Sequence, residues 1–106
     1  MNHIHLGSLV EYWWRDHRGE VRGYGPPIQV TCVNGPCTCE SFDDHINGIE
    51  RPQPKHWHVH AIVPGDKKAG TSYYNCLDDD GAELSGYGWL KVVGVAPGQI
   101  DLFGAA

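Results

Sequence analysis

Apolar residues in this sequence occur in short β-branched and aromatic runs that glycine and proline repeatedly interrupt. The clearest runs cover residues 7–14, 28–33, 55–63, 71–77 and 87–95. No stretch shows the sustained 3.6-residue apolar period of an amphipathic helix. With 14 glycines and 7 prolines, the chain also favours many tight turns. We therefore expect an all-β fold, a small SH3-like, partly open barrel of five to six antiparallel strands, with a compact sandwich as the alternative.

Two proline-containing segments are expected to break the strand pattern. Gly25-Pro26-Pro27 should interrupt pairing, because proline supplies no backbone N–H donor. Asn34-Gly35-Pro36 should form a turn that closes the strand over 28–33. The following stretch has few apolar residues, so we expect an irregular insertion at 35–54 that contains one short helical turn at 42–46.

The chain length of 106 residues is typical of one domain, and we expect a single β domain over 1–96 followed by a C-terminal tail over 97–106. No apolar run approaches the roughly 20 residues of a membrane-spanning helix. The N-terminus lacks the basic and apolar pattern of a leader, which favours a cytoplasmic protein. The formal charge of −5 disfavours direct, non-specific binding to nucleic acid.

Three of the four cysteines, Cys32, Cys37 and Cys39, fall within eight residues. In a cytoplasmic protein such a cluster favours reduced thiols or metal ligands over disulfides, although all three states stay open. A turn at Asn34-Gly35-Pro36 would bring Cys32 to face the other two thiols, and a structural zinc ion could then tie the insertion to the barrel. The predicted ligands are Cys32, Cys37, Cys39 and Cys76, with His45, His56, His58 and His60 as alternatives.

The strand predicted over 55–63 carries three histidines in strict alternation with Trp57, Val59 and Ala61. Side chains alternate between the two faces of a strand, so the histidines share one face and the apolar residues point to the core. Neighbouring histidines lie roughly 7 Å apart, so two of them can bind one ion. A metal-dependent enzyme that uses His56, His58 and His60 is one hypothesis, and a solvated polar face of the sheet is the other.

The C-terminal segment Gln99-Ile100-Asp101-Leu102-Phe103 resembles the pentapeptide with which many bacterial and phage replication and repair proteins bind the sliding clamp. That motif runs Gln, an aliphatic residue, Ser or Asp, Leu, Phe, and the resemblance covers these five residues alone. It implies that Gln99, Leu102 and Phe103 anchor the tail in a hydrophobic pocket of the clamp. The alternative is that Leu102 and Phe103 pack on the barrel.

No serine or cysteine stands in a recognisable catalytic context, so we expect binding rather than catalysis. The leading hypothesis is a small phage-like or mobile-element accessory protein that binds another protein, with the sliding clamp as the candidate partner. The alternative is an anti-CRISPR-like inhibitor of a bacterial defence system, because an acidic surface can block a groove that normally holds nucleic acid.

Overall fold

The computed structural model describes residues 1–95 of the chain. The predicted clamp-binding residues Gln99, Leu102 and Phe103 lie outside this part, so their role stays a prediction. The described residues form five strands and one short helix: β1 (Ser8–Arg15), β2 (Val21–Cys37), α1 (Phe42–Ile46), β3 (His56–Ile62), β4 (Thr71–Leu77) and β5 (Gly88–Val95). The described residues contain no helix that is long and apolar enough to cross a membrane.

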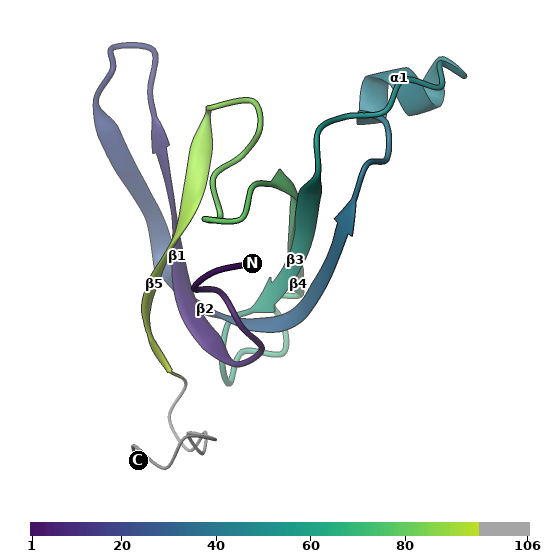
Figure 1. The fold of residues 1–106 in the computed structure, drawn as a ribbon. Coiled ribbons are helices and arrows are strands. Elements are labelled where there is room, and N and C mark those ends of the chain that lie inside the picture. The colour runs from purple at the N-terminus through teal and green to yellow at the C-terminus, as the bar shows by residue number, and fades with distance from the viewer. Residues whose placement is uncertain (96–106) are drawn as a thin grey trace.

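The five strands form one antiparallel sheet in the order β4-β3-β2-β1-β5 (Figure 1). The predicted all-β class is therefore confirmed. Over residues 1–95 the edge strands β4 and β5 do not pair with each other, so the sheet is bent and open, not closed into a barrel. The segment between them bridges both edges, since Leu77 pairs with Glu83 and Ala82 with Trp89.

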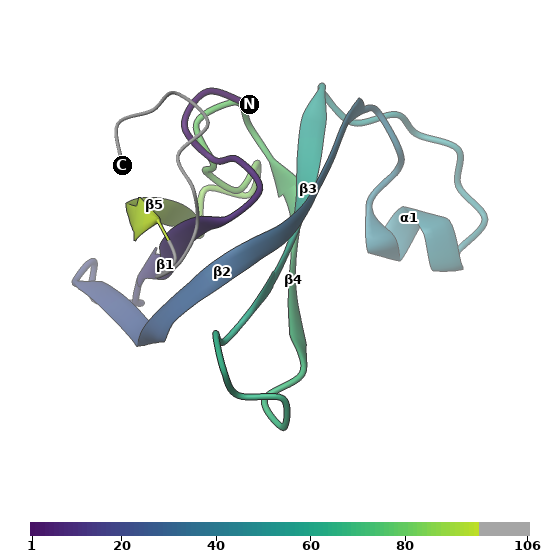
Figure 2. The same cartoon turned by 90° about the horizontal axis from the view of Figure 1, so that it is seen from below.

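β2 is one long strand where the sequence predicted an interruption at Gly25-Pro26-Pro27. The pairing with β1 does shift there, because Val10 pairs with Ile28 while Tyr12 pairs with Tyr24. The strand continues beyond this irregularity and changes direction, as Figure 2 shows. The two prolines thus produce a bend in the strand and do not end it.

The turn predicted at Asn34-Gly35-Pro36 is wrong, because these residues belong to β2. Asn34 pairs with His58 and Cys37 with His56, so Gly35 and Pro36 together stand opposite Trp57 as a β-bulge. Pairing with β3 overrides the local turn preference of this sequence. As a result, β2 extends to Cys37 and carries that residue beside the start of β3.

The core lies between the two sides of the bent sheet, where the N-terminal segment also enters (Figures 1 and 2). Val59 and Ala61 are fully buried, as predicted for the inward face of β3, whereas Trp57, predicted to share that face, is only partly buried. Ile4 closes the core from the N-terminal segment. The buried apolar residues are Ile4, Val10, Ile28, Val30, Val59, Ala61, Leu77 and Leu90.

The connection between β2 and β3, residues 38–55, contributes no buried residue to this core. It contains α1, which confirms the predicted helical turn at 42–46. Ser41 caps α1 by accepting a hydrogen bond from the Asp44 backbone N–H. Both views show α1 standing away from the sheet (Figures 1 and 2). Apolar packing on the core therefore does not hold this connection in place.

Candidate metal centre

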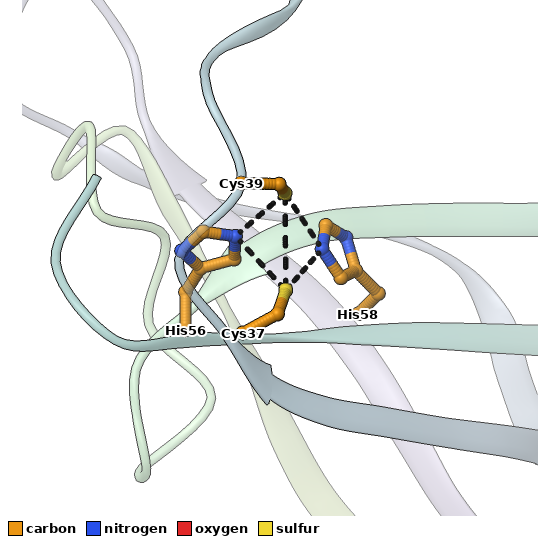
Figure 3. A group of neighbouring side chains, drawn as sticks. All are labelled: Cys37, Cys39, His56 and His58. Carbon is orange, nitrogen blue, oxygen red and sulfur yellow. Dashed lines mark hydrogen bonds between the residues drawn. The ribbon is translucent and has the colours of Figure 1, made fainter. Parts of the chain in front are cut away.

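Four side chains converge at the base of the 38–55 connection: Cys37, Cys39, His56 and His58 (Figure 3). Each offers one ligand atom, and these four atoms lie within 4.8 Å of one another. Cys37 ends β2 and pairs directly with His56, which begins β3. Cys39 and His58 each stand two residues further along the chain, a spacing that returns an extended side chain to the same face.

The spacing of the four ligand atoms suits a tetrahedral ion. The two sulfur atoms are 3.8 Å apart. The sulfur of Cys37 lies 3.3 and 3.1 Å from the Nε2 atoms of His56 and His58, and that of Cys39 lies 3.1 and 3.5 Å from the same atoms. A regular tetrahedron around zinc, with Zn–S of about 2.3 Å and Zn–N of about 2.05 Å, gives about 3.8 Å for S–S and about 3.6 Å for S–N. The S–S distance matches this value, and the S–N distances fall short of it by about 0.1–0.5 Å.

Hydrogen bonds behind the histidines orient both rings toward the sulfur atoms. His56 donates from Nδ1 to the carbonyl oxygen of Pro54 at 2.7 Å. Since a carbonyl only accepts, Nδ1 carries a proton, and Nε2 faces the cysteines. His58 makes the equivalent contact through Nδ1 to Oδ1 of Asn75 at 3.0 Å. Both rings therefore turn Nε2, the atom that would bind a metal, toward the cysteines.

Irregular pairing on both sides of β3 positions these groups. In β2, Gly35 has φ +139°, and a Cβ added to it would lie 3.0 Å from the His56 carbonyl oxygen and 3.1 Å from the Trp57 ring. In β4, the pairing shifts between Trp57 and Val59, so that Asn75 and Cys76 both stand opposite His58. Cys76 adopts φ +59°, a left-handed conformation rare outside glycine. β-Bulges of this kind re-aim side chains next to functional sites.

Burial across the cluster is graded. His56 is completely buried, Cys37 and His58 are partly buried, and Cys39 is exposed at the opening. Partial burial of its sulfur, reinforced by the adjacent Cys37 thiol, raises the pKa of Cys39 above its ordinary value. The metal-free thiol therefore keeps its proton at neutral pH. A bound cation would reverse this preference and release the proton.

Three residues of the predicted and alternative ligand sets lie elsewhere on the sheet or on the 38–55 connection. Cys32 pairs with His60 across β2 and β3, further along the ladder than the four-residue group. The His60 ring contacts Tyr73 edge-on at a centroid distance of 4.7 Å. His45 is on α1, where its Nδ1 contacts the Glu40 carboxylate at 3.2 Å. The geometry thus brings together two of the predicted cysteines and two of the alternative histidines.

Cys76 adjoins the site without belonging to the group of four. Its sulfur accepts a hydrogen bond from Nε2 of Gln53 at 3.4 Å, and the same amide donates to the carbonyl oxygen of Cys39 at 3.1 Å. The Gln53 backbone N–H also donates to the carbonyl oxygen of Thr38. Gln53 therefore links the C-terminal part of the 38–55 connection to its first residues, directly beside the ligands.

All four cysteines are free thiols, and the sulfurs of Cys37 and Cys39 face two imidazole nitrogens. The side chains of Cys37, Cys39, His56 and His58 lie close enough together to hold one metal ion. Comparisons of the chain with known protein families, with curated proteins and with solved structures found no match.

Proposed function

We propose that the protein is a zinc-stabilised β domain in which the metal is structural and the 38–55 connection binds another protein. The observation that carries this proposal is the number of protein ligands. Cys37, Cys39, His56 and His58 offer four ligand atoms within 4.8 Å of one another, enough for the four positions of a tetrahedral site. A catalytic zinc site has three protein ligands and keeps its fourth position for water or substrate, whereas a structural site is closed by four. The ligand count therefore favours a structural metal over the metal-dependent enzyme hypothesis.

The ligand types support zinc as the ion. Thiolate sulfur is a soft ligand, and imidazole nitrogen is intermediate, a combination that suits Zn²⁺. Magnesium and calcium prefer carboxylate, carbonyl and water oxygens, and no carboxylate belongs to this group. The hydrogen bonds that Pro54 and Asn75 accept from the two imidazoles add the outer contacts expected around a metal-binding histidine.

The position of the cluster supports a role in holding the connection. Its ligands flank the residues between Cys39 and His56, none of which is buried in the core. A metal bound there closes this loop at its base and supplies the stabilisation that apolar packing does not. Holding the base fixed also limits the conformations of α1 before a partner binds, which reduces the entropy lost on binding.

Metal analysis of the purified protein tests the proposal. Native mass spectrometry should find one zinc ion per chain. Substitution of Cys39→Ser should abolish zinc retention, while the matched variant Cys32→Ser should retain it, because Cys32 lies outside the group. Cobalt substitution should give the intense visible absorption of a tetrahedral site with thiolate ligands. A wild-type protein that neither carries zinc nor takes it up from solution would overturn the proposal.

A further inference from the structure

The 38–55 connection carries three large apolar side chains that are exposed in the described part of the chain. Phe42 is 77% exposed, Ile46 is 61% exposed and Ile49 is 40% exposed. Phe42 and Ile46 are four residues apart on α1, so they lie on the same side of the helix. No residue of α1 is buried, so these side chains do not serve the core. Clusters of exposed apolar residues on a small protein mark interaction sites.

The surroundings of this apolar face are acidic. The 38–55 connection contains four carboxylates, Glu40, Asp43, Asp44 and Glu50, against two basic residues, Arg51 and Lys55. Asp44 contacts Arg51 at 3.9 Å, and Glu40 contacts His45, so the segment is only partly neutralised. Exposed apolar residues flanked in sequence by an excess of acidic residues are complementary to a partner surface that offers apolar and basic side chains. The same charge repels the phosphates of nucleic acid and a second copy of this face.

We propose that Phe42, Ile46 and Ile49 form a docking face for a basic protein partner, which we call the α1 face. The partner offers an apolar pocket for Phe42 and Ile46, edged by lysine or arginine side chains. This inference rests on the proposed function, because the metal centre at residues 37–39 and 56–58 fixes both ends of the segment that carries the face.

Selection of short random peptides on a display library tests the α1 face with the full-length, zinc-loaded chain as bait. The test variant is Phe42→Ser with Ile46→Ser, and the matched control is Leu6→Ser with Tyr87→Ser. The control removes side chains of similar exposure, 64% and 55%, from other surfaces. Native mass spectrometry of every variant records its zinc content, which separates loss of the metal from loss of the face.

Selected peptides should carry net positive charge and apolar anchor residues. Their dissociation constants should rise at least about tenfold for the test variant and stay within about twofold for the control, while all proteins retain zinc. Asp43→Asn with Glu50→Gln should weaken binding and flatten its salt dependence. Three results would each overturn the basic-partner proposal. The selected peptides could be neutral or acidic, or they could bind the test variant as well as the wild type. The wild type could also form a dimer that the test variant does not form. A wild-type chain without zinc that binds basic peptides would refute the proposed metal role alone.

Discussion

Replacing Cys39 by serine should remove the metal and lower the stability of the domain without disturbing its sheet. Cys39 is the most exposed of the four ligands and follows the end of β2, so the substitution leaves the strand ladder intact. The core residues nearest the site in sequence, Val59 and Ala61, are fully buried and do not depend on its sulfur. The variant therefore isolates the contribution of the metal.

The magnitude follows from the loop that the metal closes. Residues 40–55 separate Cys39 from His56, and closing a loop of about 15 residues is worth about 3 kcal/mol in the chain-entropy description. Mass action gives a similar figure, because free zinc at about 1,000 times its dissociation constant adds about 4 kcal/mol to the free energy of unfolding. We therefore expect a loss of about 3–4 kcal/mol. For a domain of this size that loss lowers the melting temperature by about 12 °C or more.

Thermal unfolding followed by circular dichroism measures this effect for the wild type, Cys39→Ser and Cys32→Ser. Each protein is measured with zinc and with an excess of a zinc chelator. The chelator should lower the melting temperatures of the wild type and Cys32→Ser by about the same amount. Even in zinc, Cys39→Ser should melt at the temperature that the wild type shows with the chelator. Equal melting temperatures for wild type and Cys39→Ser in zinc would refute the assignment of this cluster as a structural metal centre.

Three further predictions address other features. Burial, and then the hydrogen bond to Glu83, raise the pKa of Tyr12, so its neutral form favours folding below about pH 10 and this contribution is lost at higher pH. Tyr12→Phe should lower the free energy of unfolding by about 1 kcal/mol at neutral pH. It should also reduce the loss of stability at alkaline pH, measured by urea unfolding. An alkaline loss of stability equal to that of the wild type would contradict this. Gly35→Ala should lower the free energy of unfolding by about 1–3 kcal/mol and weaken zinc binding in a competition assay, because the added Cβ meets the His56 carbonyl oxygen. Gly48→Ala should lower it less, because the space beside Gly48 is open. The reverse order of the two variants would count against the bulge geometry. Deleting residues 97–106 should abolish binding to a purified sliding clamp in surface plasmon resonance and leave zinc content unchanged, and unchanged clamp binding would rule out the peptide prediction.

Local pattern was sufficient to predict most of the elements. The strand predicted at 71–77 is β4, the alternation over 55–63 correctly assigned Val59 and Ala61 to the core, and the short helical turn is α1. These features depend on side-chain period and on residues close in sequence, which a single chain displays directly. The two-residue spacing within each ligand pair, Cys37 with Cys39 and His56 with His58, is also visible in the sequence.

Which pairs meet was decided by the tertiary structure. Asn34-Gly35-Pro36 favours a turn by local preference, and a turn would have brought Cys32 back to Cys37. Hydrogen bonding to β3 keeps this segment extended as a bulged strand, which leaves Cys32 beside His60 and places Cys37 beside His56. The sequence alone determined the strands and the kinds of ligand. The register between β2 and β3 determines which ligands meet. Register depends on pairing between residues distant in the chain, and local preference does not specify it.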